Sequence, residues 1–196
     1  MKKVLVLIVL GLWATLGQAQ NFSLSEGSEA RFYINEVLLG NDKTVIGTTT
    51  QVTGDIQFDL ANPASATVGT ISVNARELST DDNRRNNQIK NRILESTKDE
   101  FQFITFEPTT ISGLPESVAI GDTLNVQMTG NLTIHGVTQE QIFEVAITVV
   151  SETELQGLGS TTILHQDYEL SIPSVPMVAR VEDEVKLEIA FTAISN

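Results

Sequence analysis

Apolar and polar residues alternate along the middle of the chain, over residues 122–150. A period of two indicates a strand with one buried and one solvent-exposed face. The alternation is interrupted at residues 135–138, where Gly136 permits a tight reversal, and it then resumes. The apolar or small positions are Leu124, Val126, Met128, Gly130, Leu132 and Ile134, followed by Phe143, Val145, Ile147 and Val149. The segment predicts an antiparallel hairpin whose strands exceed the usual length of about five to six residues.

Shorter segments with the same character flank this hairpin. Further strands are predicted over residues 30–35, 44–52, 56–60, 68–75, 101–106, 154–164 and 185–193. Pro108 is expected to end the phenylalanine-rich strand, and the polar residues 21–27 are expected to be a loosely held lead-in. We therefore expect an all-β protein of about eight or nine strands. A single extended antiparallel barrel is favoured, because closure removes exposed sheet edges.

One segment, residues 84–94, departs from the strand pattern. Ile89, Ile93 and Leu94 have helical spacing, and residues 80–82 offer N-caps, so one short amphipathic helix is predicted to cover a barrel end. Together with Lys98 the segment contains five of the twelve Lys and Arg residues: Arg84, Arg85, Lys90, Arg92 and Lys98. These cations either pair with neighbouring acids or form a rim that meets a phosphate or carbonyl head group.

The N-terminus has the features of a secretion signal. Lys2 and Lys3 precede an apolar run over residues 4–16, and Gly17 and Ala19 place small residues at the two positions that a signal peptidase reads. The run is shorter than the roughly 20 residues that span a bilayer, so no integral membrane span is expected. We predict a signal peptide over residues 1–19 and one domain over 20–196, exported to the periplasm or secreted. A monomer and a homodimer both remain open.

Charge and cysteine content exclude several classes of function. The net charge is −13, and removal of the two signal lysines makes it −15, which disfavours nucleic acid as a partner. The chain has no cysteine, so thiol catalysis, thiolate metal sites and disulfides are excluded.

The two histidines, His135 and His165, do not form a recognisable catalytic or metal-binding motif. A zinc site requires three or four converging ligands, and these residues lie far apart in the chain. Hydrolase, metalloprotease, Walker and dinucleotide-binding signatures are all missing from the sequence. We therefore expect no catalytic residue, no metal and no cofactor, and a protein that is not an enzyme.

Three segments resemble the YceI-like family. Residues 130–138, Gly-Asn-Leu-Thr-Ile-His-Gly-Val-Thr, are similar to its G-x-L-T-I-H-G-V-T signature. Residues 73–87 followed by 103–106 resemble a second signature, and residues 47–59 resemble an early glycine-containing segment. The likeness extends over most of residues 28–193, with the segments in the family's order.

This resemblance implies a lipocalin-like barrel that holds a long polyisoprenoid chain, either an isoprenoid quinone or a polyprenyl phosphate. An eight-stranded barrel is wide enough for one small ligand. The expected ligand contacts are Phe32, Ile34, Phe58, Val73, Ile89, Ile104, Phe106, Met128, Leu132, Ile134 and Phe191. Arg84, Arg85 and His165 are the head-group candidates. The alternatives are a structural or stress-response barrel without a ligand and, less favoured, a lipid-modifying enzyme.

Overall fold

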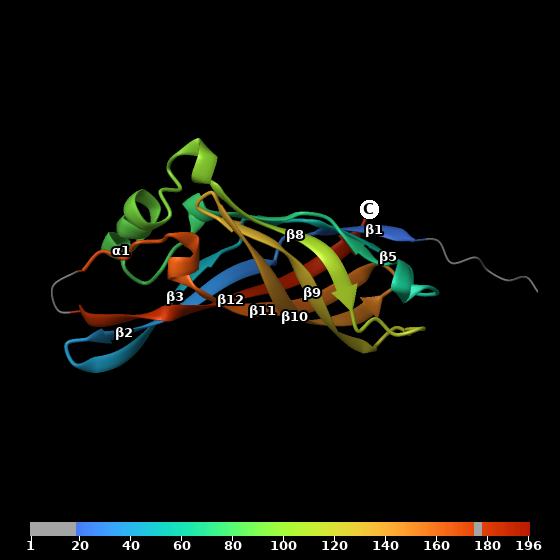
Figure 1. Ribbon diagram of the computed structural model, residues 1–196. Coiled ribbons are helices and arrows are strands. Elements are labelled where there is room, and N and C mark those ends of the chain that lie inside the picture. Colours follow the sequence, from blue (N-terminus) through green and yellow to red (C-terminus); the bar gives the residue numbers. More distant parts are fainter. Residues whose placement is uncertain (1–18, 175–177) are drawn as a thin grey trace, which may run out of the picture.

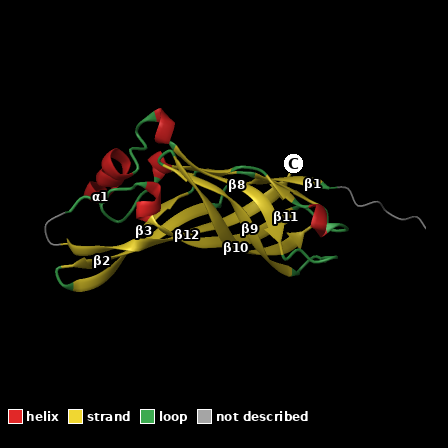
Figure 2. Cartoon of the chain, in the orientation of Figure 1, coloured by secondary structure: helices red, strands yellow, loops and turns green. Residues whose placement is uncertain are grey.

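The computed structural model describes residues 19–174 and 178–196, whose strands form one twelve-stranded antiparallel sheet (Figure 1). In chain order the strands are β1 (Gln20–Leu24), β2 (Glu29–Leu38), β3 (Asn41–Thr49), β4 (Val52–Thr53), β5 (Asp55–Phe58), β6 (Thr67–Val68), β7 (Ile71–Asn74), β8 (Phe103–Ser112), β9 (Thr123–Ile134), β10 (Val137–Ser151), β11 (Glu154–Leu164) and β12 (Val178–Ser195). Figure 2 shows the strands curling around a common axis.

The sheet closes on itself, which confirms the predicted antiparallel barrel. Strands β7 to β12 are hydrogen-bonded neighbours in chain order, and β12 pairs with β2, which pairs with β3. The chain continues from β3 into β4, and β4 pairs with β7. Thr48 and Ser79 reinforce this seam through two backbone hydrogen bonds of 2.9 Å. Short pairs of β1 with β5 and β12, and of β5 with β6, extend the wall at the opposite end.

The central hairpin is confirmed and consists of β9 and β10. Its register pairs Thr133 with Thr138 and continues to Thr123 with Thr148. The turn is made by His135 and Gly136, whose φ angles are 51° and 77°. Positive φ at both turn residues is typical of the two-residue turn that matches the twist of long hairpins.

Two expectations about strand ends were wrong. Residues 20–24 form β1 and not a loose lead-in, because Phe22 is buried at 2% exposure and β1 bridges β5 and β12. Pro108 does not end β8, which continues to Ser112. The register of β8 shifts between Pro108 and Thr110, and a bulge of this kind tolerates the missing N–H of proline.

The helical segments gather mainly at one end of the barrel (Figures 1 and 2). The predicted helix is present as α1 (Asn83–Gln88), which runs into a π-helical turn, η3 (Ile89–Ile93), in place of a single α-helix over residues 84–94. Four 3₁₀ turns complete the helical content of the described chain: η1 (Pro63–Ser65), η2 (Ala75–Glu77), η4 (Asp99–Phe101) and η5 (His165–Tyr168).

The predicted signal peptide lies almost wholly outside the described residues, since residues 1–18 are not described. Within the described ranges, no helix is sufficiently long and apolar to cross a membrane.

Buried apolar side chains fill most of the barrel interior at the end away from α1. Inward residues from six strands meet there and are buried: Phe22, Ile56, Phe58, Leu124, Val126, Met128, Val145, Ile147, Val149, Leu155 and Ala193. Each large apolar side chain buried in this way stabilises the fold by about 1.5–3 kcal/mol. Asn196 closes the same end by donating its backbone N–H to the carbonyl of Asn21 at 3.0 Å. The end beneath α1 is built differently.

Candidate functional site: an apolar cavity under the helix

A cavity of about 680 Å³ occupies the α1 end of the barrel. Its volume lies within the range of roughly 300–1,000 Å³ found for small-molecule sites. Most of its wall is apolar and comes from inward positions of β2, β7, β8, β9 and β12. The apolar lining residues are Ala30, Phe32, Ile34, Val45, Ile71, Val73, Leu78, Ile89, Ile93, Leu94, Ile104, Phe106, Leu132, Ile134, Phe143, Ile163, Leu170, Ile172, Pro173, Val178, Val181, Val185, Leu187 and Ile189.

Phe32 owes its place in this wall to a glycine on the next strand. Gly47 pairs with Phe32 across β2 and β3, and a Cβ at Gly47 would collide with the Phe32 ring. The ring therefore lies over the β3 backbone. The β2–β3 register runs through Gly47 without a shift, so the pair contains no bulge there.

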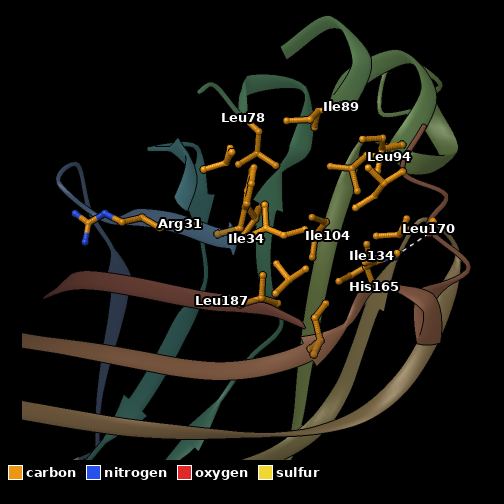
Figure 3. A pocket seen from close by; sticks show the side chains of 18 of the residues that line it. Arg31, Ile34, Leu78, Ile89, Leu94, Ile104, Ile134, His165, Leu170 and Leu187 are labelled. Atoms are coloured by element: carbon orange, nitrogen blue, oxygen red, sulfur yellow. Dashed lines mark hydrogen bonds between the residues drawn. The ribbon is translucent and has the colours of Figure 1, made fainter. Parts of the chain in front are cut away.

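The π-helical turn η3 forms the roof of the cavity (Figure 3). The Leu94 N–H donates to the Ile89 carbonyl at 2.8 Å, an i→i+5 bond. Such a turn contains more than four residues, so positions separated by four and by five lie on one face. Ile89, Ile93 and Leu94 consequently all line the cavity, whereas in an α-helix Leu94 would be rotated away from Ile89 by more than a quarter turn.

The start of the helix is fixed by Asp82, as the sequence predicted. Its Oδ1 accepts the N–H groups of Arg84 at 2.7 Å and Arg85 at 2.9 Å. Hydrogen bonds from Arg85 and then Arg84 hold the pKa of Asp82 below its usual value. The ionised Asp82 carboxylate therefore stabilises the folded protein at neutral pH. This stabilisation is lost as the pH falls through the lowered pKa of Asp82. Asn86, which is 8% exposed, adds a second anchor by accepting the Thr80 N–H and hydroxyl, both at 2.7 Å.

Arg85 links the helix to the barrel wall. Its Nη2 lies 3.2 Å from Oε1 of Glu36, an inward residue of β2 that is 7% exposed, and its Nη1 lies 2.6 Å from Asp81. Asp81 also meets Lys43 of β3 at 3.2 Å, and Lys43 is the main reason that the pKa of Asp81 is lowered. For Arg85, the structure therefore realises the ion-pairing interpretation of the basic segment.

His165 holds the loop that forms one side of the cavity. Its Nδ1 lies 3.0 Å from the Leu170 carbonyl (Figure 3), and a carbonyl only accepts, so Nδ1 carries the hydrogen. Its Nε2 lies 3.4 Å from Oδ1 of Asp183. Both ring nitrogens thus face protein partners, and the ring positions Leu170 against the cavity.

His135 serves a comparable role outside the cavity. Its ring lies 4.2 Å from the Phe101 ring, and its Nε2 is 3.2 Å from Oε2 of Glu95, just beyond η3. Hydrogen bonds from Lys98 first and His135 second lower the pKa of Glu95. The hairpin turn is therefore fastened to the segment that follows the roof. Within the described ranges, no group of three or more His, Asp or Glu side chains could hold a metal ion.

Most of the expected contact residues lie in this cavity. Phe32, Ile34, Val73, Ile89, Ile104, Phe106, Leu132 and Ile134 line it, as do Arg84, Arg85 and His165. Ile104 and Phe106 lie two positions apart on β8 and both line it, whereas Phe103 is 48% exposed. That these side chains contact a ligand remains a prediction.

Three expected contacts lie outside the cavity lining. Met128 and Phe58 belong to the packed core, and the Phe191 ring covers Gly157 on β11. Alternation identifies the inward face of a strand but not the depth along the barrel, which explains why these three residues lie away from the cavity. The same alternation could have found Phe143 and Leu187, which line the cavity and were not selected. Leu170 and Ile172 lie in an irregular loop that carries no such signal.

Comparison with known proteins now gives the fold its family. The model of the YceI-like domain matches residues 24–193, and the chain belongs to this family. A search of curated proteins found no match.

Solved structures show the same fold at low identity. BcnA of Burkholderia cenocepacia is 17% identical, with 86% of this chain and 98% of that chain covered and a TM-score of 0.66. A polyisoprenoid-binding domain from Saccharophagus degradans, implicated in plant cell wall breakdown, is 13% identical over 91% and 100% of the two chains, with a TM-score of 0.65. The YceI protein of Campylobacter jejuni is 18% identical over 76% and 84%, with a TM-score of 0.60.

Proposed function

We propose that this protein binds one isoprenoid lipid in its cavity and does not convert it chemically. The observation that carries this proposal is the apolar cavity of about 680 Å³ enclosed by the barrel wall and the η3 roof. Burying a five-carbon prenyl unit is worth on the order of 3–4 kcal/mol at ~0.8 kcal/mol per carbon group. A few units therefore offset an association cost of roughly 4–15 kcal/mol. The polyisoprenoid-binding domain among the structural neighbours supports the same ligand class.

The charges around the cavity favour an uncharged head group over a phosphate. Three lining residues are positively charged, Arg31, Arg84 and Arg85. Three are negatively charged, Glu36, Asp82 and Glu188, so the formal charges of the lining sum to zero. Arg85 already contacts two carboxylates, and Arg31 pairs with Glu29. A phosphate would have to displace these acids or share the cations with them, at a cost in desolvation. A quinone or hydroxyl head group needs only hydrogen-bond partners.

Lipid uptake tests this proposal directly. Signal-free protein is incubated with phosphatidylcholine vesicles that contain either a quinone with four prenyl units or a prenyl phosphate of the same length. We expect close to one quinone per protein, recovered with its mass unchanged. Uptake of the prenyl phosphate is expected to be about tenfold lower, because the charged residues that line the cavity carry no excess of positive charge. Ala30→Trp, which places a large ring in the cavity, serves as the blocked control. A folded protein that takes up neither lipid would contradict the proposal, and a recovered quinone of altered mass would indicate an enzyme.

We further propose that the protein is exported, because residues 1–19 have the charge, length and small residues of a cleaved signal. Protein isolated from its own host is expected to begin at Gln20 and to be found outside the cytoplasm. Edman or mass-spectrometric determination of the N-terminus checks this. A mature chain that still begins at Met1 would refute export by this route.

A further inference from the structure

The cavity ends abruptly partway along the barrel. On β9, Ile134 and Leu132 line it, whereas Met128, Val126 and Leu124 are buried in the packed core. On β10 the change occurs between Phe143, which lines the cavity, and Val145, Ile147 and Val149, which are core residues. Both strands therefore pass from cavity wall to solid core at about the same level.

Two aromatic rings lie at that level. Phe106 of β8 and Phe143 of β10 have ring centroids 4.6 Å apart and an interplanar angle of 53°. Both side chains are buried, at 7% and 6% exposure. An aromatic pair with this tilted geometry is a favourable contact. The two rings close the lower end of the cavity from opposite sides of β9.

The backbone between the rings explains why they meet. Gly130 of β9 lies between the two Phe-bearing strands, and a Cβ there would collide with the Glu107 carbonyl oxygen and lie 2.8 Å from Cα of Pro108. The register shift in β8 falls at Pro108, so β8 bends closely over β9 at this point. Because β9 presents no side chain here, the rings from the two flanking strands approach each other across it.

We infer that the Phe106–Phe143 pair is the floor that sets the longest isoprenoid tail the protein can enclose, an inference that rests on the proposed function. A tail that enters from the α1 end can therefore extend within the apolar wall only as far as these two rings. A longer tail leaves its remaining units outside the apolar wall, and those units gain no burial.

Competition among tail lengths tests the floor. Signal-free protein is incubated with phosphatidylcholine vesicles that contain equal amounts of quinones with two, four, six, eight and ten prenyl units, and the extracted lipid is quantified by mass spectrometry. Wild-type protein is expected to take up tails up to one limiting length and about tenfold less of each longer quinone. Phe143→Ala opens a path toward Met128 and Val145, and it is expected to shift this limit to longer tails. Phe58→Ala, which truncates an equally buried ring in the packed end, should leave the wild-type preference unchanged.

The outcomes separate the floor from the proposed function. Wild-type uptake of all five quinones in equal amounts would overturn the floor while leaving lipid binding intact. An unchanged preference in folded Phe143→Ala would overturn it too, and Phe143→Leu provides the same comparison if the alanine variant does not fold. Absence of every quinone from folded wild-type protein would instead refute the proposed function, and the floor with it.

Discussion

Replacing Leu124 by alanine is expected to lower the free energy of unfolding by about 3–5 kcal/mol, whereas Leu132→Ala is expected to cost only about 1–3 kcal/mol in the ligand-free protein. Both leucines are buried inward residues of β9, at 6% and 3% exposure. Leu124 is surrounded by core side chains, so its truncation leaves a new void in a close-packed region. Leu132 already faces the cavity, and its truncation enlarges an existing space.

The two leucine variants should rank in the opposite order when the stability gained on lipid loading is compared. A bound ligand stabilises the folded state by RT ln(1 + [L]/Kd), so a weaker ligand contact appears as a smaller gain on loading. Leu132→Ala is expected to reduce that gain, and Leu124→Ala is expected to keep it. Met128→Ala should behave like Leu124→Ala, because Met128 belongs to the core. Urea midpoints of each variant, measured without ligand and after quinone loading, give both the stability loss and the gain on loading. Equal large losses for both leucine variants, with unchanged loading, would mean that Leu132 is an ordinary core residue.

The wall of this barrel was predictable from the sequence because its strands are long and strictly alternating. Residues 124–149 specified both the hairpin and the face of each strand, and the structure reproduces the turn at Gly136. The capped helix was also recognisable, from Asp82 before an amphipathic segment. Its conversion to a π turn at Ile89 was not, because apolar residues at positions 89, 93 and 94 fit the expected α-helix as well.

The depth of the cavity could not be predicted, because alternation is a property of one strand and depth depends on neighbours far away in the chain. Met128 and Leu132 have the same pattern, yet only Leu132 lies above the level where β8 bends over Gly130. The ion-pair partner of Arg85 could not be predicted for the same reason. Glu36 occupies an inward position of β2, and only closure of the barrel brings it beneath α1.

The Arg85–Glu36 pair leads to the second large effect. Arg85→Ala is expected to lower the free energy of unfolding by about 2–4 kcal/mol, because it leaves the Glu36 carboxylate buried without its cation. The Glu36 side chain is 8% exposed and the Arg85 side chain 23%, so the loss is somewhat below that of a fully buried pair. Arg84→Ala is the matched control, since no ion pair of Arg84 is recorded in the described chain, and it should cost less than about 0.5 kcal/mol.

Replacing Glu36 by an uncharged residue should restore the stability that Arg85→Ala removes. In Glu36→Gln/Arg85→Ala the buried group is uncharged, so most of the lost stability is expected to return, measured by chemical denaturation of the single and double variants. Similar losses for Arg84→Ala and Arg85→Ala, or no recovery in the double variant, would show that the pair is only a surface contact. The pair also tethers the helix that leads into the roof, because it joins α1 to the wall strand β2. Arg85→Ala should therefore release bound quinone to acceptor vesicles several-fold faster than wild type.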